Sequence, residues 1–132
     1  MSNPDTELEA MHRDMVLALR KSPADILSSM DKSKADLLHA ILGIAGEAGE
    51  LVDAVKKHVI YGQPLDLVNC KEEGGDLEFY LAQFRLAIGI TRNEMLRANM
   101  EKLAVRYPGF NYSDAAAKER KDKQCQTTSQ SE

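Results

Sequence analysis

Two pairs of carboxylates with the same three-residue spacing, Glu47 with Glu50 and Glu73 with Asp76, are the residues of this chain best suited to chemistry. If both segments are helical, each pair lies on one helix face, because residues three apart are lateral neighbours. A turn between the helices then brings the pairs together. Four carboxylates repel one another unless a hard divalent cation neutralises them, and oxygen ligands suit magnesium or manganese better than zinc. The spacing therefore predicts a site for Mg²⁺ or Mn²⁺.

Glycines accompany both acidic pairs. Gly46 and Gly49 stand beside the first pair, and Gly74 with Gly75 separates the two members of the second. A glycine in a helix interior costs about 1 kcal/mol relative to alanine, so these positions predict close approach of another helix or of a bound ligand. One acidic pair alone is typical of a solvated helix face. Two pairs, each lined by glycine, favour a metal-binding cleft.

A third element carries polar and basic groups. Asn99, Lys102 and Arg106 recur at i, i+3 and i+7, so they share a helix face and offer an amide, an ammonium and a guanidinium to phosphate oxygens. On spacing alone they equally fit ordinary solvated helix charge. Together with a metal cleft they predict phosphoryl-group hydrolysis, in which metal ions offset charge and lower the pKa of an attacking water. Glu47 or Glu50 would accept the proton of that water.

The elements that must position these residues are expected to be helical, and no strand-like alternation of useful length occurs. A first helix is expected over about residues 6–21, and a short one around residues 26–30. Ser33 and Asp36 resemble a capping box that opens a long central helix ending near Tyr61. The core stripe expected on the first helix consists of Leu8, Met11, Met15 and Leu19.

Two further helices follow in the sequence. One is expected from about residues 64–66 to Gly89, and the other opens at a Thr91–Glu94 capping box and ends near Arg106. The expected fold is an all-α domain over residues 1–113, a four-helix bundle with a short extra helix. Residues 114–132 are expected to form a polar tail that is disordered from about Lys121.

Composition limits the class of protein. A chain of 132 residues, 43% of them apolar, suits one globular domain with one core. The net charge of −4 argues against nucleic-acid binding, which usually needs a basic face. No run of about 18 apolar residues occurs and the N-terminus does not resemble a signal peptide, so we expect no membrane association and a cytoplasmic location. Cys70 and Cys125 are expected to be reduced thiols.

Three motifs occur in a fixed order along residues 36–110: Gly46-Glu47-Ala48-Gly49-Glu50-Leu51, then Glu73-Gly74-Gly75-Asp76-Leu77, then Asn99-x-x-Lys102-x-x-x-Arg106-Tyr107-Pro108-Gly109-Phe110. In order and separation they resemble the motifs of the MazG-type all-α nucleoside triphosphate pyrophosphohydrolases. That family cleaves between the α- and β-phosphates of a nucleoside triphosphate, giving a monophosphate and pyrophosphate.

The resemblance implies a MazG-like helical bundle that assembles into a homodimer or a higher homo-oligomer. It implies that magnesium is held by four carboxylates and that phosphates are contacted by two basic side chains; these are Glu47, Glu50, Glu73, Asp76, Lys102 and Arg106. Glu72 adjoins Glu73, but the three-residue spacing to Asp76 favours Glu73. Gly74 stands where the family usually has a large apolar residue.

Other functions stay open. A di-iron carboxylate bundle would need two Glu-x-x-His pairs, and the chain offers only Glu9 with His12 and the poorer Asp36 with His39. A non-catalytic helical adaptor would release no pyrophosphate from any nucleoside triphosphate. Hydrolysis of dUTP or of phosphoribosyl-ATP is separable only by substrate profile. The aromatic residues that fit either base stacking or a core are Tyr61, Phe79, Tyr80, Phe84 and Tyr107.

Overall fold

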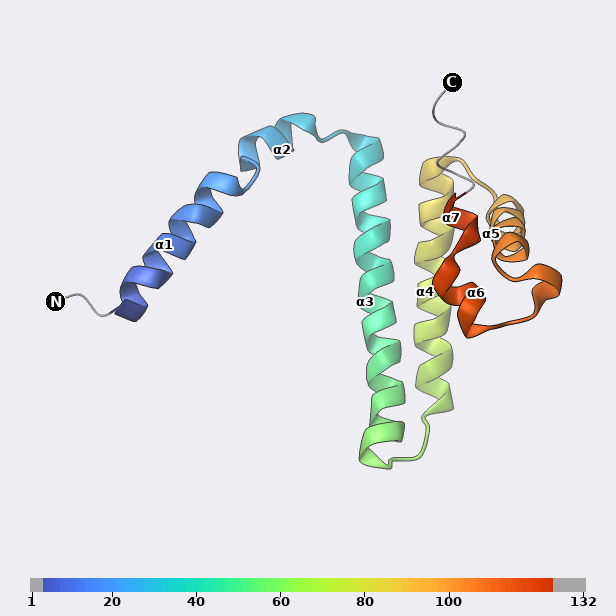
Figure 1. Ribbon diagram of the computed structural model, residues 1–132. Helices are drawn as coiled ribbons and strands as arrows, with labels where there is room; N and C mark the ends of the chain where they lie inside the picture. Colours follow the sequence, from blue (N-terminus) through green and yellow to red (C-terminus); the bar gives the residue numbers. More distant parts are fainter. Residues whose placement is uncertain (1–3, 125–132) are drawn as a thin grey trace, which may run out of the picture. The chain divides into compact units, whose positions relative to one another are not determined.

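The computed structural model describes residues 4–124, which are mainly helical and contain no strand. The elements are α1 (Pro4–Leu19), α2 (Pro23–Ser29), α3 (Lys32–Tyr61), α4 (Leu67–Ile88), α5 (Arg92–Arg106), a 3₁₀ turn η1 (Pro108–Phe110), α6 (Asp114–Glu119) and α7 (Lys121–Gln124) (Figure 1). The prediction of an all-α protein is therefore confirmed. Within this range no helix combines the length and the apolar character that crossing a bilayer requires.

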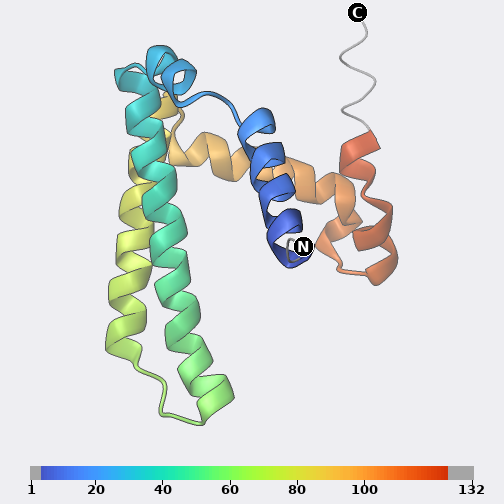
Figure 2. The same ribbon diagram turned by 90° about the vertical axis from the view of Figure 1, so that its left-hand side faces the viewer.

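The two longest helices, α3 and α4, form an antiparallel hairpin (Figures 1 and 2). Gly62 adopts a φ of 66° just after α3, in the left-handed region that favours glycine. Asp66 then caps α4, because its Oδ1 accepts hydrogen bonds from the backbone N–H groups of Val68 at 3.1 Å and Asn69 at 3.0 Å. Gly89, with a φ of 68°, ends α4. Residue types at both ends thus fix the length of the helix that carries Glu73 and Asp76.

Gly43 of α3 lies against the ring of Tyr80 on α4. A Cβ atom at Gly43 would overlap the Cγ, Cδ1 and Cε1 atoms of that ring. His39 meets the same ring edge-on at 5.7 Å between centroids. Beside them, Gln83 Nε2 donates a hydrogen bond of 2.7 Å to Asp36 Oδ1. Gly43 is therefore the glycine that helix packing requires.

The two expected capping boxes have different outcomes. The Thr91–Glu94 box is confirmed, since Thr91 Oγ1 accepts from the Glu94 N–H at 3.2 Å and Glu94 Oε2 accepts from the Thr91 N–H at 2.7 Å. The Ser33–Asp36 box is wrong. α3 begins at Lys32, and Asp31 caps it by accepting from the Lys34 N–H at 2.9 Å. Asp31 stands directly before the first helical residue, so its side chain reaches the third N–H of the helix.

The segment expected to be a polar tail is helical through residue 124. Ser113 caps α6 by accepting from the Ala116 N–H at 3.1 Å, and α7 packs against α5. The contact includes an ion pair between Arg106 and Asp122, and Asp122 is only 4% exposed. The composition of the segment did not indicate that Asp122 would pair with a residue of α5. Residues 125–132, including Cys125, lie outside the described part of the chain.

Little apolar surface is buried in the described residues of this chain. Ala40 and Ala54 are the buried apolar residues, and no large side chain is fully buried. The stripe expected to be core on α1 is exposed instead, at 67% for Leu8, 66% for Met11, 49% for Met15 and 78% for Leu19. The chain divides into two compact units, residues 1–35 and 36–132.

Candidate metal-binding site

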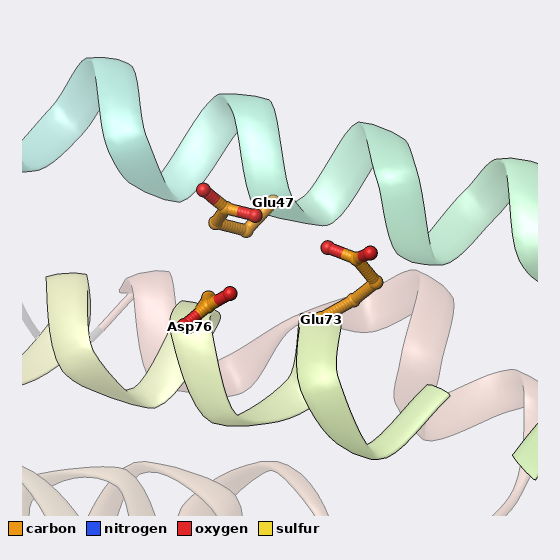
Figure 3. A group of neighbouring side chains, drawn as sticks. All are labelled: Glu47, Glu73 and Asp76. Atoms are coloured by element: carbon orange, nitrogen blue, oxygen red, sulfur yellow. The ribbon is translucent and has the colours of Figure 1, made fainter. Parts of the chain in front are cut away.

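Three carboxylates meet between α3 and α4. Glu47 extends from α3, and Glu73 and Asp76 extend from α4 toward it (Figure 3). One oxygen of each lies within 4.8 Å of the oxygens of the other two. Glu73 and Asp76 share a face of α4, as their spacing predicts, and Glu73 rather than the exposed Glu72 belongs to the group. The antiparallel hairpin therefore brings together acidic residues from two helices.

Glu50, the fourth expected carboxylate, lies at the edge of this group. It is exposed and falls outside the three-residue cluster, but it lines a pocket of about 370 Å³ together with Glu73. Its charge also raises the pKa of Glu73. The charges of Glu47, Glu50 and Asp76 thus all act on Glu73, and oxygens of three of the four predicted residues lie within 4.8 Å of one another.

Glu73 is the electrostatic centre of the site. Only 9% of it is exposed. Burial raises the pKa of its carboxyl group most, followed by the nearby carboxylates of Glu50, Glu47 and Asp76. Within residues 4–124 no lysine, arginine or histidine forms an ion pair with any of the four. A charged Glu73 is therefore unfavourable unless a cation joins the group.

The donor atoms of the cluster suit a hard cation. All three ligand residues offer oxygen, and in the described part of the chain no histidine or cysteine belongs to such a group. His12 is exposed, His39 Nδ1 lies 3.2 Å from Gln83 Nε2, and His58 Nδ1 lies 2.7 Å from the carbonyl oxygen of Gln63. Residues 4–124 thus assemble no carboxylate–histidine set of the di-iron kind. The residues present fit Mg²⁺ or Mn²⁺.

The glycines beside the acidic pairs are not in contact with another helix. A Cβ atom added at Gly46, Gly49, Gly74 or Gly75 would meet no atom within 4 Å. Close approach of a helix is therefore excluded as their reason within the described chain, and ligand approach remains a prediction. Gly46 and Gly49 do line the pocket that holds Glu50 and Glu73.

The predicted phosphate-binding residues lie apart from the carboxylate pocket, which no residue of α5 lines. Asn99 is exposed and Lys102 is half-buried. Arg106 is held by Asp122 through two hydrogen bonds, Nε to Oδ1 at 2.8 Å and Nη2 to Oδ2 at 2.7 Å. The guanidinium lowers the pKa of Asp122 to about 2, and the carboxylate raises the pKa of Arg106. The described chain thus gives Arg106 a carboxylate partner at the atoms that would bind phosphate.

Sequence reasoning missed three polar residues that line the same pocket, Asp53, Lys57 and Asn69. Lys57 is not among the residues that the sequence motifs single out. Its spacing carried a signal nonetheless, because seven residues from Glu50 is two helical turns and hence the same face. Asn69 likewise stands one turn before Glu73. The spacing along each helix was therefore enough to place Lys57 on the same face as Glu50, and Asn69 on the same face as Glu73.

The chain was compared with known proteins, and no protein-family model, curated protein or solved structure matches it. The likeness to the MazG-type enzymes therefore rests on the three motifs in the sequence. The function must be argued from the site.

Proposed function

We propose that this protein is a metal-dependent nucleoside triphosphate pyrophosphohydrolase, which cleaves a ribo- or deoxyribonucleoside triphosphate between the α- and β-phosphates. The observation that carries the proposal is the oxygen cluster of Glu47, Glu73 and Asp76, within 4.8 Å and centred on a nearly buried glutamate. Like charges gathered at this distance without a basic partner are stabilised by a divalent cation. The three-motif resemblance gives the reaction type.

The roles of the residues follow from their positions. Glu47, Glu73 and Asp76 would hold Mg²⁺ or Mn²⁺, with Glu50 at the mouth of the pocket as a fourth acidic group. The bound cation would offset the charge of the phosphates and lower the pKa of an attacking water. Glu47 or Glu50 would take the proton of that water. No nucleophilic side chain is required, because hydrolysis of a phosphoanhydride depends on positioning and on charge neutralisation.

The proposal includes assembly as a homodimer. Large apolar side chains of the hairpin are exposed, among them Val52 at 65%, Val59 at 67%, Phe79 at 64% and Leu86 at 82%. A single chain with so little buried apolar surface is marginally stable, and a second copy would cover such a face. Light scattering after size exclusion would test this assembly. A monomeric mass across the concentration range of the activity assay would refute it.

Pyrophosphate release tests the activity directly. The full chain would be incubated with each nucleoside triphosphate, with magnesium or with a chelator, and pyrophosphate distinguished from orthophosphate. Glu73→Gln and Asp76→Asn should each lower turnover by at least about 100-fold while circular dichroism stays unchanged, because each removes a cation ligand. Glu72→Gln is the matched control, since that exposed neighbour lies outside the cluster. A folded protein that releases no pyrophosphate from any substrate would refute the proposal and favour the adaptor.

A further inference from the structure

The carboxylate site continues toward the turn of the α3/α4 hairpin. The pocket of about 370 Å³ that holds Glu50 and Glu73 is bordered by Lys57 and Asn69. The same two residues line a second pocket of about 510 Å³, together with Ala54 and residues of the connecting loop. Lys57 and Asn69 therefore line both pockets. The first of these pockets also contains Glu50 and Glu73.

Both residues present hydrogen-bond donors at this junction. Lys57 Nζ lies 2.8 Å from Asp53 Oδ2, and an ammonium has three donors, so this ion pair leaves donors for a second acceptor. The backbone N–H of Asn69 is bonded to Asp66, but within the described chain no hydrogen bond engages its side-chain amide. The pocket thus offers one positive charge, which is paired with Asp53, and an uncommitted amide beside the carboxylates of Glu50 and Glu73.

The spacing of these donors from the acidic residues suits a polyphosphate. Lys57 follows Glu50 by seven residues on one face of α3, a rise of about 10 Å along the axis. Asn69 precedes Glu73 by one turn of α4, about 6 Å. A chain of two or three phosphates that starts at a cation held by the carboxylates would extend along this cleft. By contrast, α5 contributes no residue to either pocket.

We propose that Lys57 and Asn69 form a phosphate subsite of this cleft, which binds the phosphate group of the substrate farthest from the carboxylate cluster. This inference rests on the proposed function and adds to it the residues that hold the leaving diphosphate. Asp53 lines the same pocket and holds Lys57 in an ion pair at 2.8 Å. Lys57 binds through charge and a hydrogen bond, and Asn69 donates from the opposite helix.

The chain contains a matched control for this subsite. Lys56 also pairs with Asp53, at 3.5 Å, but it lines neither pocket. Lys56→Gln and Lys57→Gln remove the same charge from adjacent positions of one helix. Any difference between them therefore reports the position of the side chain rather than the net charge of the protein.

The test is calorimetric binding of inorganic tripolyphosphate to the full chain with magnesium, together with steady-state hydrolysis. Lys57→Gln should weaken binding and raise KM by about tenfold or more, since a hydrogen bond to a charged group is lost. Its kcat should change far less. Lys56→Gln should stay within about threefold of the parent. Asn69→Asp, which replaces the donor by a negative charge, should weaken binding further than Asn69→Ala.

Failure of the subsite is distinguishable from failure of the proposed function. If the parent hydrolyses nucleoside triphosphates and Lys57→Gln binds tripolyphosphate no more weakly than Lys56→Gln, the subsite is refuted and the activity stands. If the parent neither binds tripolyphosphate nor releases pyrophosphate, both inferences are refuted. Circular dichroism of each variant separates a loss of fold from a loss of binding, and Asn69→Ala provides a second substitution if Lys57→Gln does not fold.

Discussion

Replacing Gly43 by alanine tests the helix contact on which the site depends. The added methyl group would overlap the Tyr80 ring, and that ring is already held at its edge by His39. The overlapped atoms include Cγ, the ring atom attached to Cβ of Tyr80. The ring therefore has little freedom to move away, and α3 and α4 must separate locally. Glu47 lies one turn further along α3, so the separation would also open the carboxylate cluster.

The size of the effect follows from two opposing terms. Alanine in a helix interior is favoured over glycine by about 1 kcal/mol. Overpacking against a confined side chain costs about 1 to 3 kcal/mol. Gly43→Ala should therefore lower the free energy of unfolding by up to about 2 kcal/mol. Gly75→Ala, where an added Cβ meets nothing within 4 Å, should raise it by up to about 1 kcal/mol.

Urea unfolding followed by circular dichroism would measure both variants at one protein concentration. A double-mutant cycle with Tyr80→Ala then isolates the contact, because Gly43→Ala should become stabilising once the ring is removed. Titration with Mn²⁺ on the same samples should show weaker binding for Gly43→Ala alone. If Gly43→Ala is as stable as Gly75→Ala in the presence of Tyr80, the helices do not approach at Gly43 and the position of the carboxylates must be reconsidered.

Three further predictions concern local interactions. The ion pair of Asp122 with Arg106 should persist above pH 3.8 and be lost as the pH falls toward about 2, because the pKa of Asp122 is lowered to about 2 on folding; the Arg106 Nε–H signal in NMR reports this. Thr91→Ala should lower the free energy of unfolding by about 1 kcal/mol, measured in urea, because α5 loses its N-cap. Glu73→Gln should raise the melting temperature near neutral pH without divalent ions, because the raised pKa of Glu73 means that its charged form destabilises the fold.

Each has an outcome that contradicts it. An Arg106 signal that is equally protected in Asp122→Asn would show that the ion pair does not hold α7. Thr91→Ser should retain the cap, so a loss equal to that of Thr91→Ala would assign the effect to the methyl group. The advantage of Glu73→Gln should shrink as the pH falls and the parent carboxyl becomes protonated. Mn²⁺ should stabilise the parent but not this variant, and equal stabilisation of both would remove Glu73 from the cation site.

The local features of the fold could be predicted from the sequence. The Thr91–Glu94 capping box, the end of α4 at Gly89 and the shared face of Glu73 and Asp76 each depend on residues within one or two helical turns. Interactions between residues one or two turns apart are set by the helix geometry and by the side chains within those turns. The same reasoning located both acidic pairs and distinguished Glu73 from Glu72.

Non-local contacts could not be predicted in this way. The helical segment after residue 113 packs against α5, and its composition did not indicate that contact. Arg106 faces Asp122, 16 residues away, although its spacing suggested a phosphate. Periodicity identifies which face of a helix is apolar or charged, but it does not identify the partner of that face.

By itself, the sequence determined that the chain is helical, where α4 and α5 are capped, and which carboxylates share a helix face. The tertiary structure decided that Glu47 faces Glu73 and Asp76, that Gly43 is the glycine required by packing, and that Lys57 shares a pocket with the acidic residues. The physical reason is the range of the interactions. Backbone hydrogen bonds and side-chain phase act within a few residues, whereas the burial and the raised pKa of Glu73 exist only once two distant helices are side by side.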